Sequence, residues 1–270
     1  MRELAPAKVN LCLYLGPRRD DGYHELLSVF QAIDLCDVLE LSDHDRDEVR
    51  CPGLEGPNIA ARAMALFREA TGWDGPPQLL QIEKRIPIAA GLGGGSADAA
   101  GALRLLARRS GLRADLHALA IALGADVPSQ LEPGRHLVEG IGQRLTRLPD
   151  PGPFGVLVLP SQARLSTAAV FAKADELGLP RSAQEIKRAR ASLDPDGPDP
   201  VNDLATAARA LEPAIDAAIA RFPGSVLTGS GPTLFKVFPT LQDAQDAAGE
   251  CSAAGVVAHA CAPVHNSSLK

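Results

Sequence analysis

The segment Pro87-Ile-Ala-Ala-Gly-Leu-Gly-Gly-Gly-Ser-Ala97 places four glycines within five residues, directly before a run of helix-forming residues. Because glycine has no Cβ atom, the backbone amides of such a loop can approach an anion closely. The run from Asp98 to Arg109 predicts a helix, and we expect Ser96 to cap its first turn. The amides and the positive dipole end of a helix start favour negative charge, so the segment predicts a phosphate site. A mobile glycine-rich linker is the alternative.

Two familiar phosphate-binding loops do not match this segment. A Walker A loop ends in Gly-Lys-Ser/Thr, whereas this chain has Gly95-Ser96-Ala97. A dinucleotide fingerprint fails at its last glycine, where Ser96 stands, and no acidic residue ends a clear second strand about twenty residues later. The Ser96 hydroxyl could instead bond a phosphate oxygen or a magnesium ion. We therefore expect a nucleoside triphosphate, held by a third kind of loop.

The composition is that of a globular chain. Its 270 residues, 46% of them hydrophobic, suit one large or two medium domains. The net charge is −6 without a long basic run, so we expect no nucleic-acid partner. Five cysteines form no CxxC pair, which indicates reduced thiols. The longest apolar run, 155–159, is too short to span a bilayer, so we expect no membrane partner. The N-terminus has no apolar secretory region, so we expect a cytoplasmic protein.

Two segments near the N-terminus predict a pair of strands. Apolar residues alternate with others from Val9 to Leu15, the two-residue period of a half-buried strand, which puts Lys8 and Asn10 on one face. The turn 18–24 then leads into a second strand, 25–33. We expect further strands at 35–41, 79–86, 136–140, 145–148, 155–159, 225–228, 233–238 and 256–260, and an exposed turn at 42–48.

Capping residues delimit most of the expected helices. Helices are expected at 58–71, 115–123 and 167–177. Further helices are expected to begin at 182 and at 240, and a pair of helices divided at 213 is expected to begin at 202. The segment Pro149-Asp-Pro-Gly-Pro153 interrupts this pattern, and domain boundaries fall in such links. We therefore expect an α/β (α+β) chain of two domains, residues 1–150 and 151–270.

Four motifs in order resemble the GHMP kinases, the small-molecule kinases that include galactokinase, homoserine kinase and mevalonate kinase. The motifs are Pro6-Ala-Lys-Val-Asn-Leu-Cys-Leu13 with Asp21-Gly-Tyr-His24, the glycine-rich segment 87–97, Gly124-Ala-Asp-Val-Pro128, and Leu227-Thr-Gly-Ser-Gly231. The resemblance covers nearly the whole chain. The sequence departs from the family pattern at Ser129, Gln130, Gln143 and Pro232.

The resemblance implies a two-domain fold with the active site in the cleft between the domains, ATP and Mg²⁺ as cofactors, and Lys8 and Asp126 as catalytic residues. Asp126 would accept or orient the proton of the acceptor hydroxyl, and Lys8 would fix Asp126 and offset developing negative charge. A plain turn-forming role for Asp126 is the alternative. Ser96 would be the metal ligand. The residues implied to hold ATP are Pro87, Ile88, Ala89, Ala90, Gly91, Leu92, Gly93, Gly94, Gly95, Ser96 and Ala97.

The branch of the family with these motifs implies a small-molecule acceptor, a cytidine diphosphate-linked methylerythritol phosphorylated on its 2-hydroxyl for isoprenoid synthesis. Aromatic residues would enclose the cytosine ring, and His24 would bond its edge. The implied acceptor residues are Asn10, Tyr23, His24, Thr167, Phe171 and Gly229. A kinase for homoserine or mevalonate, or a catalytically silent nucleotide sensor, remains open, as do a plain hairpin at 229–231 and a packing role for Tyr23. A monomer or a homodimer is expected.

Overall fold

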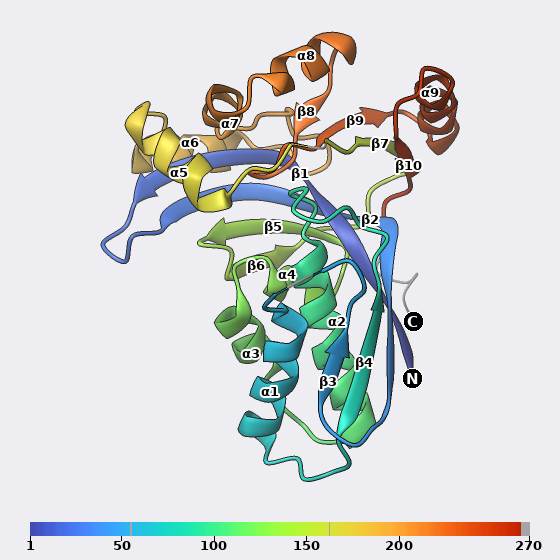
Figure 1. The fold of residues 1–270 in the computed structure, drawn as a ribbon. Coiled ribbons are helices and arrows are strands. Elements are labelled where there is room, and N and C mark those ends of the chain that lie inside the picture. Colours follow the sequence, from blue (N-terminus) through green and yellow to red (C-terminus); the bar gives the residue numbers. More distant parts are fainter. Residues whose placement is uncertain (55, 162, 266–270) are drawn as a thin grey trace.

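The computed structural model describes residues 1–54, 56–161 and 163–265 and has the expected mixture of sheets and helices (Figure 1). The strands are β1 (Arg2–Arg18), β2 (His24–Asp43), β3 (Glu48–Arg50), β4 (Gln78–Glu83), β5 (Arg135–Gly140), β6 (Arg144–Arg147), β7 (Gly155–Leu159), β8 (Val226–Leu227), β9 (Leu234–Phe238) and β10 (His259–Cys261). The helices are α1 (Ile59–Thr71), α2 (Gly94–Ser110), α3 (Leu116–Leu123), α4 (Val127–Leu131), α5 (Thr167–Glu176), α6 (Ala183–Ser192), α7 (Ala205–Leu211), α8 (Ala214–Arg221) and α9 (Leu241–Ala253).

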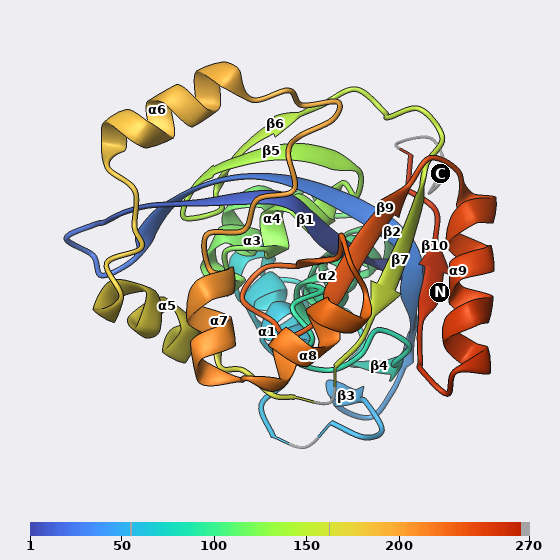
Figure 2. The ribbon, with the colours of Figure 1, turned by 90° about the horizontal axis from the view of Figure 1, so that it is seen from above.

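The strands form two sheets, and the long antiparallel pair β1 and β2 belongs to the larger one. The larger sheet has the order β3-β4-β2-β5-β6 with β1 on β2, and the smaller has the order β10-β7-β9-β8. One core cluster joins the larger sheet to α1, α2 and α3, and a second joins β1 and β2 to β7 and β9. Figure 2 shows α9 beside β10 and β7. A third core cluster joins the smaller sheet to α5, α7, α8 and α9. No helix in the described ranges is long and apolar enough to cross a membrane.

The first strand connects the two halves of the chain. Its Leu13 forms a bridge with Asn202 and packs against Leu157 and Val170 of the second half. The backbone carbonyl of Leu15 accepts a hydrogen bond from the amide of Arg181. The division into domains at 150 stays a prediction, and the first strand pair contacts both parts.

Several strand boundaries differ from the sequence-based expectation. The expected strands 25–33 and 35–41 are one strand, β2, in which a bulge lies where Pro6 pairs with Cys36 and Ala7 pairs with Ile33. The predicted strand 9–15 is only part of β1, because residues 5–13 are all buried and the two-residue alternation is lost. The turn expected at 42–48 is shorter in the structure, since β2 continues to Asp43 and the edge strand β3 begins at Glu48.

The strands predicted at 79–86 and 256–260 have different bounds in the structure. β4 ends at Glu83 because the amides of Arg85 and Ile86 turn away from the sheet and donate to the buried carboxylate of Asp37, at 2.6 and 2.8 Å. The last strand, β10, begins only at His259.

Helix starts with side-chain caps were predicted well. Asn58 caps α1 through the amide of Ala60, and Asp115 caps α3 through the amide of Ala118. Complete capping boxes begin α6 at Ser182 and α9 at Thr240. The short helix α4 was not predicted, because five residues are too few to show a helical period and its N-cap residue Asp126 makes no capping hydrogen bond.

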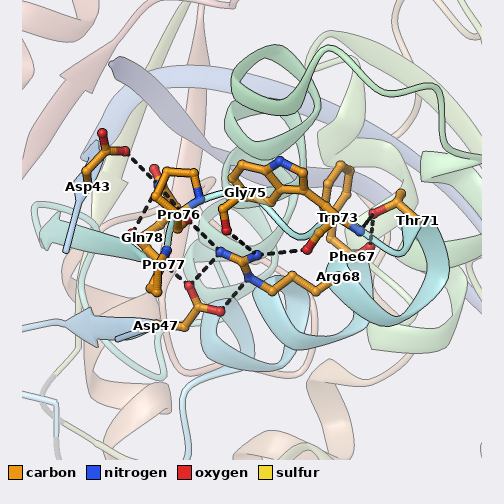
Figure 3. Close-up of polar contacts among 10 residues, drawn as sticks. All are labelled: Asp43, Asp47, Phe67, Arg68, Thr71, Trp73, Gly75, Pro76, Pro77 and Gln78. Carbon is orange, nitrogen blue, oxygen red and sulfur yellow. Dashed lines mark hydrogen bonds and ion pairs between the residues drawn. The ribbon is translucent and has the colours of Figure 1, made fainter. Parts of the chain in front are cut away.

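Arg68, in the last turn of α1, fixes the loop that leads into β4 (Figure 3). Its guanidinium donates to the carbonyl oxygens of Trp73 and Pro76, at 2.9 and 2.8 Å, and lies 4.3 Å from the centre of the Trp73 ring. It also bonds the carboxylate of Asp47 at 3.0 Å. Since that carboxylate accepts the amide of Gln78, the cluster holds the first residue of β4, the strand that leads to the glycine-rich segment.

Candidate active site

A cavity of about 1160 Å³ is lined by β1, β2, α2, α5 and the turn at 229–230. Pockets for one small molecule usually have about 300–1000 Å³, so this cavity is large enough for more than one. The structure places most of the sequence-predicted site residues on its wall. They are Lys8, Asn10, Tyr23, His24, Pro87 to Ser96, Asp126, Thr167, Phe171 and Gly229. Ala97 is the exception, since it lies in the first turn of α2 and is fully buried in the core.

The glycine-rich segment presents unpaired amides to this cavity. α2 begins at Gly94, and its N-cap is Gly93, so the expectation that Ser96 caps the helix is wrong: Ser96 is already in the first turn. Among the described residues, the backbone amides of Gly94, Gly95 and Ser96 have no hydrogen-bond acceptor, whereas Ala97 donates to the carbonyl of Gly93. Three free amides at a helix start form a site for an anion.

Left-handed backbone is confined to the part of the segment that precedes the helix. Ala89, Gly91 and Gly93 have φ values of 56°, 76° and 71°, whereas Gly94 and Gly95 are helical. A Cβ atom on Gly91 would lie 2.6 Å from the carbonyl oxygen of Thr228. Glycine is therefore required at position 91 both for its backbone conformation and for the close approach of the C-terminal turn.

Lys8 and Asp126 meet inside the cavity. The Nζ atom of Lys8 lies 3.3 Å from Oδ2 of Asp126, with side chains 5% and 33% exposed. Lys8 also donates to Oδ1 of Asn10 at 2.7 Å and to the carbonyl of Gly91 at 3.4 Å, and lies 4.6 Å from the centre of the Phe30 ring. Asp126 is the N-cap residue of α4 but makes no capping hydrogen bond. Its carboxylate is thus not used in the local turn.

Asn10 connects this pair to the C-terminal glycine turn. Its amide group donates to the hydroxyl of Ser28, and its Oδ1 accepts from Thr228 at 3.3 Å. The turn at Gly229 has a φ of 58°, and a Cβ atom there would lie 3.3 Å from Oδ1 of Asn10. The hairpin predicted at 225–238 is present, and its turn packs against the site, with Ser230 bonded to Thr167 at 2.9 Å.

The aromatic residues lie around the turn that joins β1 to β2. Tyr23 is 60% exposed, and the ring of His24 lies 5.5 Å from that of Phe171 on α5. The Nε2 atom of His24 is bonded to a carboxylate oxygen of Asp175 at 2.7 Å. Asp175 was not predicted from the sequence, although it lies one helical turn after Phe171 and therefore on the same face of α5.

A buried cluster behind the glycine-rich segment was also not predicted from the sequence. The ammonium group of Lys84 lies between the carboxylates of Asp37 and Asp98, 2.8 Å from Oδ2 of Asp98. Burial raises the pKa of the Asp98 carboxyl to about 7 despite the Lys84 cation, and the nearby Asp37 carboxylate adds to the rise. Because Asp37 also holds the amides of Arg85 and Ile86, the cluster links β2, the segment after β4 and α2.

Comparisons with known proteins identify the family of the chain. The family description "GHMP kinases N terminal domain" matches residues 58–132, which include the start of α2 and Asp126. A relative from Anaeromyxobacter dehalogenans (strain 2CP-1) is 41% identical over 266 residues, which cover 91% of this chain and 83% of that protein. The chain therefore belongs to the GHMP kinase family. That relative is a 4-diphosphocytidyl-2-C-methyl-D-erythritol kinase, as is a protein from Granulibacter bethesdensis that is 39% identical across 90% of this chain and 87% of its own length.

Solved structures show the same fold. The crystal structure of a 4-(cytidine 5'-diphospho)-2C-methyl-D-erythritol kinase matches with a TM-score of 0.81 and 33% identity, covering 98% of this chain and all of that one. A homoserine kinase from Cytophaga hutchinsonii matches with a TM-score of 0.69 and 17% identity, covering 98% of this chain and 94% of that one. The second likeness shows the fold alone. The α/β GHMP kinase fold predicted from the sequence is confirmed.

Proposed function

We propose that the protein is a kinase that transfers the γ-phosphate of ATP to the 2-hydroxyl of 4-diphosphocytidyl-2-C-methyl-D-erythritol, giving the 2-phosphate and ADP. The observation that carries the proposal is the approach of Lys8 to Asp126 within 3.3 Å on the wall of one cavity. That cavity also contains the free amides at the start of α2 and the rings of His24 and Phe171.

ATP is proposed to lie along the glycine-rich segment. The amides of Gly94, Gly95 and Ser96 would bind its phosphates, and the positive end of the α2 dipole adds to that attraction. Magnesium prefers oxygen ligands and needs only one or two from the protein beside phosphates and waters. The Ser96 hydroxyl fits that need, since it lies on the wall and has no hydrogen-bond partner among the described residues. Bound there, the ion would neutralise phosphate charge.

Asp126 is proposed to bind and orient the acceptor hydroxyl and to take its proton. Phosphoryl transfer depends mainly on positioning and on stabilisation of charge. Lys8 suits the stabilisation of charge because Asn10, Gly91 and Phe30 hold it in place as charge develops. Asp126 suits the positioning of the acceptor hydroxyl because its side chain is 33% exposed and lies on the cavity wall.

The cytidine end of the acceptor is proposed to bind at the far side of the cavity. Tyr23 and Phe171 would stack on the base, with Asn10, Thr167 and Gly229 nearer to the reacting hydroxyl. Stacking cannot distinguish one base from another, so the ring edge must be read by a hydrogen-bonding group. His24 is the group on this wall that can do so. We further propose that the enzyme acts in the cytoplasm as a monomer or a homodimer.

A substrate panel tests the proposal against its rivals. Purified protein should convert ATP to ADP in the presence of the cytidylyl acceptor and not with homoserine or mevalonate. Turnover with either of the other acceptors would identify a different kinase of the family. ATP binding without turnover on any acceptor would identify a nucleotide-binding sensor. The retention of both Lys8 and Asp126 in contact argues against the sensor.

A further inference from the structure

A carboxylate from the second half of the chain holds the imidazole of His24. His24 is the first residue of β2, and Asp175 is near the end of α5. Nε2 of His24 and Oδ1 of Asp175 are 2.7 Å apart, and the His24 side chain is only 3% exposed. Arg18 approaches the other oxygen of Asp175, at 3.8 Å. Both residues of the pair line the cavity, and Asp175 follows Phe171 by one turn of α5.

This contact decides which ring nitrogen of a neutral His24 carries the proton. A carboxylate can only accept a hydrogen bond, so the proton must be on Nε2. The other nitrogen, Nδ1, then has a free lone pair and acts as an acceptor. Carboxylates fix the tautomer and orientation of histidines in the same way where the imidazole must present one chosen nitrogen.

An acceptor at this position distinguishes the two pyrimidine bases. Cytosine has an exocyclic amino group, which donates hydrogen bonds, where uracil has a carbonyl oxygen, which accepts them. A lone pair on Nδ1 attracts the first and repels the second. Without a partner for Nε2, the ring could carry its proton on either nitrogen and would lose this preference.

We propose that Asp175 is a specificity-determining positioning residue: by accepting the Nε2 proton of His24 it makes Nδ1 an acceptor for the amino group of cytosine. The inference rests on the proposed function, because it assigns the base that the acceptor site selects. It adds a residue that acts through His24 and contacts neither the reacting hydroxyl nor ATP. A purely structural role, in which the pair only ties the turn 18–24 to α5, predicts equal losses for every acceptor.

The variant Asp175→Asn tests this directly, since an amide of the same shape can either donate or accept and no longer fixes the tautomer. The preference in kcat/KM for the cytidylyl acceptor over its uridylyl analogue should fall about tenfold, the value of one hydrogen bond. The change should lie in the acceptor KM, with kcat and the KM for ATP preserved. The neighbouring variant Glu176→Gln is the control, because Glu176 is exposed and pairs only with Lys173 in the described ranges.

An unchanged preference, or equal losses for both acceptors, would overturn the proposal. Imidazole ¹⁵N chemical shifts of the wild-type protein give a second test that needs no turnover and no stable variant. They should show His24 protonated on Nε2 alone, and protonation on Nδ1 alone would contradict the account. If the wild type does not phosphorylate the cytidylyl acceptor, the proposed function fails, whereas the tautomer measurement still decides whether Asp175 controls His24.

Discussion

The ammonium group of Lys8 lies 3.3 Å from the carboxylate of Asp126, and the two differ in how firmly they are held. Lys8 is buried and contacts the Asn10 side chain, the Gly91 carbonyl and the Phe30 ring. Asp126 has a more open side chain and makes no capping bond. The fixed cation and the accessible carboxylate have the arrangement needed to orient a hydroxyl and stabilise the charge that forms on it.

Loss of either member of this pair should affect turnover far more than ATP affinity. Asp126→Asn and Lys8→Met are each expected to lower kcat by about 100-fold or more, because proton transfer and charge stabilisation act mainly in the transition state. ATP affinity measured by calorimetry should change only a few fold. The double variant should lose less than the product of the two single losses. Independent, multiplicative losses would show that the residues do not act together.

The phosphate site can be tested at a helical glycine. Gly95 is exposed at the start of α2, and a Cβ atom there would make only ordinary contact, 3.5 Å from Ile59. Gly95→Val should therefore fold but weaken ATP binding about tenfold or more, since the branched side chain occupies the space over the free amides. Gly249→Val in α9 is the matched control, because nothing lies within 4 Å of its Cβ position. Equal ATP affinity in both variants would exclude this phosphate site.

The cluster around Lys84 predicts a pH-dependent stability. The pKa of Asp98 is about 7, above its ordinary value of about 3.9, so the folded protein holds this proton more tightly than the unfolded chain. Between those two values, rising pH removes the proton from the unfolded chain while the folded protein still holds it, which lowers the free energy of unfolding. Asp98→Asn has no proton to lose. Its melting temperature relative to wild type should therefore rise between about pH 4 and about pH 7.

The exposed variant Asp45→Asn is the control for that measurement, since its carboxyl is outside the cluster. The difference in melting temperature between Asp45→Asn and the wild type should stay constant over the same pH range. A constant difference for Asp98→Asn over the same range would mean that Asp98 keeps its charge throughout, as a simple partner of Lys84.

The base-binding role of the aromatic residues predicts a selective change in the acceptor KM. Tyr23→Ala and Phe171→Ala should each raise it about tenfold, which corresponds to about 1.4 kcal/mol, while the KM for ATP stays constant. Tyr23 is 60% exposed, so its removal should leave the melting temperature nearly unchanged. An unchanged acceptor KM in both variants would mean that the two rings do not hold the base.

The sequence predicted those features whose signals are local. The caps at Asn58, Ser182 and Thr240 and the glycine-rich segment were found because each lies within a few residues of the element that it defines. The strand pair was predicted, but both strands were made too short, because burial of residues 5–13 hides the alternation before Val9 and a bulge divides β2. Ser96 was misplaced as a cap because the freedom of glycine allows the helix to begin at Gly94.

The resemblance to a family implied that Lys8 and Asp126 act together, but two other contacts near the site could not be predicted. Asp175 and His24 are 151 positions apart, and neither neighbourhood carries a pattern that points to the other. The same holds for Lys84, whose two carboxylates come from β2 and α2. Such pairs arise from the packing of the whole chain, which a short sequence window does not contain.

The most direct test of the account is the ³¹P NMR spectrum of the product formed from ATP and 4-diphosphocytidyl-2-C-methyl-D-erythritol. The account predicts one new phosphate monoester resonance, coupled to C2 of the methylerythritol, with the diphosphate of the acceptor intact and one ADP formed for each product. Release of inorganic phosphate without a new ester, or a phosphate attached at another position, would contradict it.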